Sequence, residues 1–290
     1  MTTYNVIGAG LAGSLVTRLL RKHGFQVRLY DDADPFSGSR ASSNLYCAHW
    51  LSKFGSESRR GIDVLEHLFP DQIDQPFSRG IADAAKIRHI AQRYLLVEPD
   101  VAGRVELGRT MGTPYDSWEY VTTHGGGRNY EGPIVLCCGH RANQLFPGAH
   151  PDLSILVGHC LKVKGVLPPS TSSITLPLPY RHAKLYQFDP ETIYFADSTR
   201  LALKSFEKRK VDLERELRDK CRDALDAVDL GNDIGMEDVE YLVGYRPCTK
   251  SSFGELRRLA PQVWSINGGG KQGMVAYAKL AADLLEELKK

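Results

Sequence analysis

The residues best suited to chemistry near the start of the chain are three glycines at the spacing of a dinucleotide-binding turn. They occur in the run Gly8-Ala9-Gly10-Leu11-Ala12-Gly13. In a G-x-G-x-x-G turn the first glycine permits the tight bend, the second lets a pyrophosphate approach the backbone, and the third lets helix and strand pack closely. The phosphates then lie against the free N–H groups and the positive end of the following helix. We therefore predict that Gly8, Gly10, Leu11, Ala12 and Gly13 bind a nucleotide cofactor.

An acidic residue follows this turn at the distance expected of a ribose ligand. Asp31 lies 18 residues after Gly13, at the end of a second predicted strand. A carboxylate there accepts hydrogen bonds from the ribose hydroxyls and favours an unphosphorylated ribose, so FAD or NAD over NADP. Asp32 takes this role if the strand ends one residue later. The alternative is a Rossmann-like turn that binds nothing.

The elements around the turn have the order that positions such a site. Strand Tyr4–Ile7, helix Ser14–Lys22 and strand Gln26–Tyr30 form a βαβ opening, and Leu15, Leu19 and Leu20 give the helix an apolar face. Two short helical pieces are predicted next, at Arg60–Leu68 and Ile81–Gln92. A buried strand then starts at Ile134 and ends before Gly139.

The second half is richer in strands. The pattern predicts strands Ile155–Val166, Leu185–Phe188 and Thr192–Ala196, a long amphipathic helix Ser205–Val228, and strand Val263–Ile266, followed by a glycine-rich loop and a helix from Met274. The predicted fold class is α/β, with a Rossmann-type nucleotide-binding domain and a second, mostly antiparallel-sheet α+β domain; the family resemblance given next implies that the first is an FAD-binding domain and the second a substrate domain. We assign residues 1–75, 120–150 and 240–290 to the first domain, and residues 76–119 and 151–239 to the second.

Four further segments carry a family resemblance. They are Ser39-Arg40-Ala41-Ser42-Ser43-Asn44, the segment from Gly132 to Leu145 that contains Cys138-Gly139, Gly244-Tyr245-Arg246-Pro247-Cys248-Thr249, and Ser265-Ile266-Asn267-Gly268-Gly269-Gly270-Lys271-Gln272-Gly273-Met274. In combination and order they resemble the FAD-dependent amino-acid oxidases, which include glycine oxidase, D-amino-acid oxidase and sarcosine oxidase. The chain is shorter than typical members, mainly between Leu51 and Tyr120, which implies a reduced lid and an open site.

The resemblance implies non-covalent FAD and a set of residues that hold it. Beyond the first turn and Asp31 or Asp32, these are Arg40, Ala41, Ser42, Ser43, Cys138, Gly139, Gly269, Gly270, Lys271, Gln272, Gly273 and Met274. The last six form a loop that enters a helix, and the bare N–H groups of such a helix end stabilise negative charge. In the family this end lies near the flavin edge that becomes negative on reduction. The other interpretation of this loop is a flexible turn before the final helix.

The same resemblance implies oxidation of the C–N bond of an amino acid or amine, with hydride transfer from the α-carbon to flavin N5. Arg246 matches the arginine that holds the substrate carboxylate in glycine oxidase, and its forked guanidinium suits that role; otherwise it is paired structurally with an acid. Lys271 is a second carboxylate contact, a residue that tunes the flavin, or an exposed loop lysine. His49 lines the flavin face or is simply packed, and Tyr245 is a further pocket candidate.

Composition adds few constraints. The chain has 290 residues, 42% hydrophobic and 25% charged, with a net charge of +2, which is ordinary for a globular protein and favours no class of charged partner. No apolar run approaches the ~20 residues of a membrane span, and the first strand-like run begins at Tyr4, three residues after Met1, which leaves no room for a signal peptide; we therefore expect a cytoplasmic protein. The six cysteines lack metal-ligand spacing, and no metal is predicted.

Two other functions stay open beside oxidation of a free amino acid or amine. The amino-acid group could be tethered to a nucleic-acid base, as in tRNA or phage DNA modification, with an oxidase or lyase outcome; Arg59-Arg60, Lys208-Arg209-Lys210 and Arg257-Arg258 are the candidate phosphate contacts. The protein could instead bind a nucleotide without catalysis. An NAD-dependent dehydrogenase is the weakest rival, because it leaves the two C-terminal segments unexplained. The pattern does not predict an oligomeric state.

Overall fold

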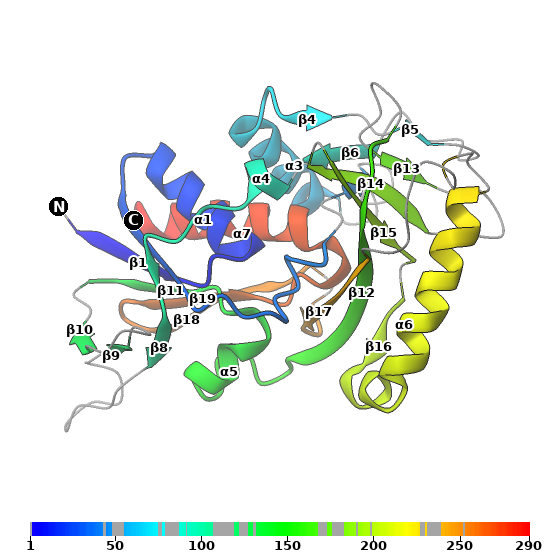
Figure 1. Ribbon diagram of the computed structural model, residues 1–290. Coiled ribbons are helices and arrows are strands. Elements are labelled where there is room, and N and C mark those ends of the chain that lie inside the picture. The colour runs from blue at the N-terminus through cyan, green and yellow to red at the C-terminus, as the bar shows by residue number, and fades with distance from the viewer. Residues whose placement is uncertain are drawn as a thin grey trace.

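The computed structural model describes the larger part of the chain. This part comprises residues 2–42, 45–47, 55–74, 77–78, 87–90, 92–106, 119–121, 127–129, 132–167, 173–175, 183–189, 191–197, 199–226, 230, 239–251 and 253–290. Figure 1 shows two layered units joined along one side, with the two termini close together at one end.

The first unit is built on a six-stranded sheet of order β18-β19-β11-β1-β2-β7. Its strands are β1 (Thr3–Ile7), β2 (Gln26–Asp31), β7 (Val101–Ala102), β11 (Ile134–Leu136), β18 (Glu255–Ala260) and β19 (Val263–Asn267). All neighbours pair in parallel except β18 with β19. Because parallel strands share their carboxyl-end edge, the segments that follow β1, β11 and β19 meet at one edge of the sheet.

Alternate strand residues face two different cores. Val6, Val135 and Ile266 pack with helices α1 (Leu11–Lys22), α3 (Ser56–Leu68) and α7 (Gly273–Leu288) on one face. Ile7 and Leu136 face the other side, beside the segment that follows α5 (Ala142–Leu145). Figure 1 shows α1 and α7 side by side over the first face, and α3 against α7. The apolar face predicted for α1 is confirmed, since Leu15, Leu19 and Leu20 are buried.

The second unit is a mostly antiparallel sheet of order β16-β12-β15-β14-β13-β5, in which β17 also pairs with β12. Its strands are β5 (Phe77–Ser78), β12 (Ser154–Lys164), β13 (Ser173–Thr175), β14 (Lys184–Asp189), β15 (Thr192–Ala196), β16 (Leu201–Ala202) and β17 (Glu240–Cys248). Helix α6 (Leu203–Asp226) covers this sheet and buries Phe206, Leu213 and Leu217, as its amphipathic pattern predicts. The predicted fold class is therefore confirmed.

The remaining elements are short. They are β3 (Leu45–Cys47), β4 (Ile73–Asp74) and β6 (Ile87–Ile90) in one small sheet, β8 (Arg104–Glu106), β9 (Glu119–Val121) and β10 (Gly127–Asn129) in another, helix α4 (Gln92–Leu95), and the 3₁₀ turns η3 (Gly139–Arg141) and η4 (Gly270–Gln272). None of the described helices has both the length and the apolar character needed to cross a membrane.

The structure corrects one sequence expectation. The helix predicted over Ile81–Gln92 is wrong at residues 87–90, where β6 pairs antiparallel with both β3 and β4. Helix α4 begins at Gln92, and residues 81–86 lie outside the described residues. Pairing with two remote strands outweighs the weak local helical pattern, because sheet stability comes from cross-strand contacts. In addition, β7 lies in the stretch 76–119 that we assigned to the second domain, yet it pairs with β2 of the first sheet. Likewise, β17 lies in the stretch 240–290 that we assigned to the first domain, yet it pairs with β12 of the second sheet. The domain division itself stays a prediction.

Candidate cofactor and substrate site

The glycine-rich turn between β1 and α1 is shaped by close backbone packing. Gly8 has φ +103°, and a Cβ on it would lie 2.5 Å from the carbonyl oxygen of Cys137 at the end of β11. A Cβ on Gly13 would lie 1.8 Å from the carbonyl oxygen of Gly8 itself. Side chains at either position would push the helix away from the strands. The glycines are therefore required by the contact that brings the start of α1 to the edge of the sheet.

The N-terminus of α1 opens into a cavity of about 510 Å³ that is lined by Gly8, Gly10, Leu11 and Ala12. Gly10 is the N-cap and supplies no side-chain cap, and the first turn holds no acidic residue. The Leu11 N–H donates to Ser39 Oγ at 2.7 Å, and a Cβ on Gly10 would lie 2.9 Å from the same oxygen. The N-terminus of a helix carries a partial positive charge, and no acidic or N-cap side chain neutralises it here, so this helix end can bind an anionic group.

Three carboxylates lie at this end of the cavity, and each has a partner. Asp31 ends β2 and accepts the Ala9 N–H at 2.5 Å, so it holds the glycine turn, while its other oxygen accepts the Ala33 N–H at 2.6 Å. Asp32 forms an ion pair with Arg141. Asp34 lies 3.3 Å from His140 Nε2, and the pKa of His140 is lowered, chiefly by burial. Both predicted ribose ligands therefore line the cavity beside the turn.

The segment from Phe36 to Ser42 crosses over β17 and forms another wall. The Tyr245 N–H donates to the Phe36 carbonyl at 2.8 Å, and the two rings stack at 4.9 Å. A Cβ on Gly38 would lie 2.7 Å from the Tyr245 carbonyl oxygen, so only glycine permits this approach. The Tyr186 hydroxyl donates to the Ser42 carbonyl at 3.1 Å, which ties the segment to the second sheet.

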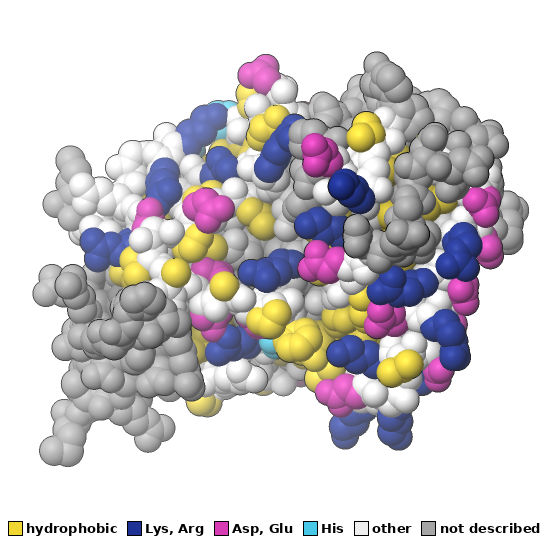
Figure 2. Space-filling model, viewed as in Figure 1, with side chains coloured by type: hydrophobic (Ala, Val, Ile, Leu, Met, Phe, Trp, Pro, Cys, Tyr) yellow, Lys and Arg dark blue, Asp and Glu magenta, His cyan; other side chains and the backbone are white. Residues whose placement is uncertain are grey.

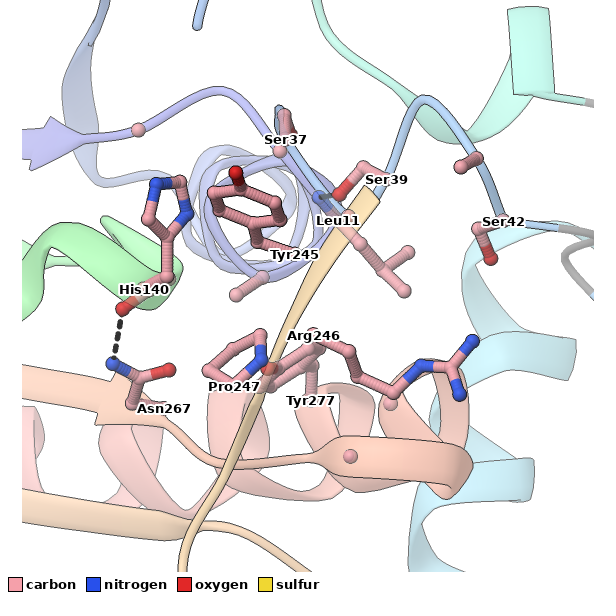
Figure 3. Close-up of a pocket in the computed structure, with 18 of the residues that line it drawn as sticks. Leu11, Ser37, Ser39, Ser42, His140, Tyr245, Arg246, Pro247, Asn267 and Tyr277 are labelled. Carbon is pink, nitrogen blue, oxygen red and sulfur yellow. Dashed lines mark hydrogen bonds between the residues drawn. The ribbon is translucent and has the colours of Figure 1, made fainter. Parts of the chain in front are cut away.

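The C-terminal glycine loop closes the cavity from the opposite side. Asn267, the buried last residue of β19, donates from Nδ2 to the Gly139 carbonyl at 2.7 Å and accepts the Gly268 N–H at 2.9 Å. Figure 3 shows this bond joining the two segments. The Gly269 N–H donates to the Tyr277 hydroxyl at 3.2 Å. Gly270 and Lys271 then lead into α7, whose first residues also line the cavity.

Arg246 projects from β17 into the same cavity. A Cβ on Gly158 of the neighbouring strand β12 would lie 3.2 Å from its Nη2, so the missing side chain makes room for the guanidinium. Burial, followed by the positive charge of Arg200, lowers the pKa of Arg246. Within the described part of the chain, no carboxylate forms an ion pair with it. Figure 3 shows Tyr245 pointing the other way, toward His140, whose ring packs edge-on against it at 5.0 Å.

The cavity brings together most of the residues that the sequence analysis proposed. Its lining includes Gly8, Gly10, Leu11, Ala12, Asp31, Asp32, Ala41, Ser42, Cys138, Gly139, Tyr245, Arg246, Gly270, Lys271, Gln272, Gly273 and Met274. Gly13 and Gly269 lie behind this surface and support it through packing. Arg40 is exposed and is not part of the lining. Ser43 and His49 lie outside the described residues.

Sequence reasoning missed several lining residues. Lys184 begins β14, Arg200 follows β15, and Asn267 ends β19. Lys184 and Arg200 belong to no motif, and a lysine or arginine at a strand end has no signal that separates it from a surface charge. Asn267 was named in the C-terminal segment but without a role.

Comparisons with known proteins agree with this geometry. The family model of the NAD(P)-binding Rossmann-like domain matches residues 6–66. No curated protein matches the chain by sequence. Among solved structures, glycine oxidase from Bacillus cereus ATCC 14579 is similar, with a TM-score of 0.67, 12% identity and coverage of 100% of this chain and 96% of the other.

Two further solved structures are similar over nearly the whole chain. Iminodiacetate oxidase from Chelativorans sp. BNC1 has a TM-score of 0.57, 16% identity and coverage of 96% of this chain and 93% of the other. An FAD-dependent oxidoreductase from Pseudomonas aeruginosa has a TM-score of 0.58, 14% identity and coverage of 99% and 90%. The chain has the fold of these oxidoreductases. The predicted resemblance to the amino-acid oxidases is thus confirmed at the level of the fold.

Proposed function

We propose that the protein is an FAD-dependent oxidoreductase that oxidises the C–N bond of an amino acid or amine. One observation carries this proposal: a single cavity runs from the glycine turn at the start of α1 to Arg246 and the loop that begins α7. A nucleotide cofactor and a carboxylate-bearing substrate would meet there. The fold shared with glycine oxidase and iminodiacetate oxidase supports the same reaction class.

The residues present fit FAD along its length. The N-terminus of α1 and the close-packed glycines suit a pyrophosphate, and Asp31 and Asp32 lie where a ribose would follow. At the other end, the start of α7 suits the edge of a flavin ring. We assign to FAD the lining residues of these three segments, together with Ala41, Ser42, Cys138 and Gly139. When bound, FAD supplies a hydride acceptor at its N5 atom.

The chain's own part in the reaction is binding and orientation. Arg246 offers two parallel N–H donors, so it can bind both oxygens of a carboxylate and fix the direction of the α-carbon. Holding a substrate in one orientation lowers the barrier because less freedom is lost on the way to the transition state. Tyr277, buried behind Gly269, keeps the C-terminal loop in place. No acid–base residue is required by this scheme.

The test is a visible spectrum of the purified protein after exposure to FAD, repeated anaerobically with candidate amines. We expect a flavin spectrum that an amino acid or amine bleaches. Arg246→Ala should keep the flavin and lose most of the turnover, whereas Arg209→Ala on α6, remote from the cavity, should behave as wild type. A protein that takes up no FAD would refute the proposal, and a bound flavin that no amine bleaches would favour the non-catalytic alternative.

The alternative of a substrate tethered to nucleic acid receives less support from the surface. Arg209 pairs with Glu216 at 2.8 Å, Arg60 with Glu286 at 2.7 Å, and Arg258 packs over the ring of Trp264. Figure 2 shows basic and acidic side chains interleaved along α6 rather than a stripe of one sign. A phosphate backbone favours a continuous basic track. Activity on free amines compared with glycyl-modified nucleic acid would separate the two hypotheses.

A further inference from the structure

The segment that follows β2 covers one side of the cavity. Residues 32–42, called the strap below, leave the end of β2, cross over β17 and reach the second sheet. Most of its residues line the cavity. In Figure 3, Ser37, Ser39 and Ser42 of the strap follow one side of the view, opposite Arg246. A cofactor that lies along the cavity, with its phosphates at the start of α1, would therefore contact the strap over much of its length.

The last residues of the strap are anchored by buried side chains. Gln92 Nε2 donates to the Ser39 carbonyl at 3.1 Å, and the Tyr186 hydroxyl donates to the Ser42 carbonyl at 3.1 Å. Gln92 and Tyr186 are both buried. Breaking such bonds leaves a buried polar group without a partner, which is strongly unfavourable. We therefore expect residues 39–42 to stay in place.

The first residues of the strap are held by contacts that water can reach. Asp32 forms an ion pair with Arg141, and Asp34 Oδ2 lies 3.3 Å from His140 Nε2. All four side chains are between 15% and 29% exposed. Ion pairs within reach of water contribute little net free energy, because solvent and salt screen them. These two contacts therefore hold the strap only weakly.

Phe36 closes the same end of the strap from outside. Its ring stacks on the Tyr245 ring with the centroids 4.9 Å apart, and the Tyr245 N–H donates to its carbonyl at 2.8 Å. Phe36 is 40% exposed and is not among the residues that line the cavity. Removing its ring would therefore loosen the strap without removing a contact to the cofactor.

Backbone strain lies at the start of the strap. Ala33 has φ +56° and is the only non-glycine residue with a positive φ in the described part of the chain. Alanine is disfavoured in this left-handed conformation, because its Cβ comes too close to the following carbonyl oxygen. The Ala33 N–H donates to Asp31 Oδ1 at 2.6 Å, which helps to hold the conformation. Movement of the strap about Ala33 would release this strain.

The weakly held residues lie between two fixed points, Asp31 at the end of β2 and the anchored Ser39. We propose that residues 32–38 are a gate that lifts away from η3 and β17 to admit or release FAD, and that closes again through the Phe36–Tyr245 stack. This inference rests on the cofactor site of the proposed function but not on the amine reaction.

A gate differs in its kinetics from a contact that simply binds the cofactor. The same contacts have to break before FAD enters and before it leaves. Weakening them should therefore speed binding and release by the same factor and leave Kd unchanged. The loss of a direct contact to FAD, in contrast, speeds release alone.

Release of FAD after dilution of the FAD-loaded protein tests the gate. The fluorescence of the released flavin gives the release rate and, at equilibrium, Kd, and the release rate divided by Kd is the binding rate. We expect Phe36→Ala to raise both rates about fivefold, the effect of losing an aromatic stack. Ala33→Gly relieves the strain of the closed gate and should lower both rates about fivefold. Tyr94→Ala removes a similarly exposed ring that does not line the cavity, and it should leave both rates unchanged.

A disulfide across the gate tests the movement directly. Phe36→Cys combined with Tyr245→Cys places two thiols where the rings stack, and thiol titration reports the bridge. After oxidation the FAD-loaded double variant should retain FAD on dilution, and a reductant should restore release, whereas Phe36→Cys alone should not respond. Equally fast release with and without the bridge, or a Phe36→Ala variant in which binding is not accelerated, would overturn the proposal. A flavin that no amine bleaches contradicts the proposed reaction and leaves these rates unaffected, whereas a protein without FAD contradicts both.

Discussion

Replacement of Gly13 by alanine tests the closest contact in the cofactor turn. The added Cβ would lie 1.8 Å from the Gly8 carbonyl oxygen and 3.3 Å from Cys137 Cβ. The helix or the turn has to move by about 1.6 Å, from 1.8 Å to the 3.4 Å at which ordinary van der Waals contact begins, and interiors packed at crystal-like density resist such shifts. The movement pulls the start of α1 away from the sheet edge, where a pyrophosphate would bind.

The expected magnitude follows from two opposing effects. Overpacking destabilises the fold by ~1–3 kcal/mol, at the upper end when the clash is with backbone. Within a helix, however, alanine is more stabilising than glycine by ~1 kcal/mol. We expect a net loss of about 2 kcal/mol in the free energy of unfolding and at least tenfold weaker FAD binding, since ~1.4 kcal/mol corresponds to one factor of ten. Urea denaturation measures the first quantity, and flavin absorbance after gel filtration measures the second.

Gly24→Ala is the matched control. Gly24 has φ +81°, and its Cβ would have no atom within 4 Å. Forcing alanine into this left-handed conformation costs ~1–2 kcal/mol, a loss close to that of Gly13→Ala but remote from the cavity. This variant should keep full FAD binding. The reasoning is refuted if Gly13→Ala binds FAD as tightly as the wild type, or if Gly24→Ala loses flavin to the same extent.

Three other predictions follow from contacts around the cavity. Gly38→Ala should clash with the Tyr245 carbonyl and weaken FAD binding, which fluorescence titration of FAD measures. An unchanged affinity would show that the 36–42 segment does not contribute to FAD binding. Burial lowers the pKa of Lys184, which lines the cavity, to about 8, so kcat/KM for a carboxylate-bearing amine should fall as pH rises through 8; Lys184→Arg should move this fall to higher pH, and an identical profile would exclude Lys184 as its cause. Although burial opposes it, hydrogen bonds from His159, Lys220 and Thr199 hold the pKa of Asp197 well below its usual range. The ionised Asp197 therefore stabilises the fold fully above about pH 4, and this stabilisation is lost as the pH falls further. Asp197→Asn should have a lower free energy of unfolding than the wild type at pH 7 and should lose less of it on acidification, as measured by urea denaturation.

Local pattern was sufficient for the cofactor half of the protein. The G-x-G-x-x-G run, the apolar face of α1 and the alternation of strand and helix are short-range features, because a turn and the helix that follows it are specified by neighbouring residues. The buried strand before Gly139 and the glycine loop before α7 were recognised from sequence for the same reason. Arg246 was identified only through the resemblance of its segment to the oxidases.

Tertiary structure decided what those patterns could not. Residues 87–90 form a strand because β3 and β4 lie on either side of β6, and no helical or alternating pattern reports that pairing. Lys184 and Arg200 line the same cavity as Arg246 because β14, β15, β12 and β17 are neighbours in one sheet. Each residue alone has the sequence context of a solvated charge. The burial and the neighbouring cations that lower the pKa of Lys184 arise only when the sheet has formed.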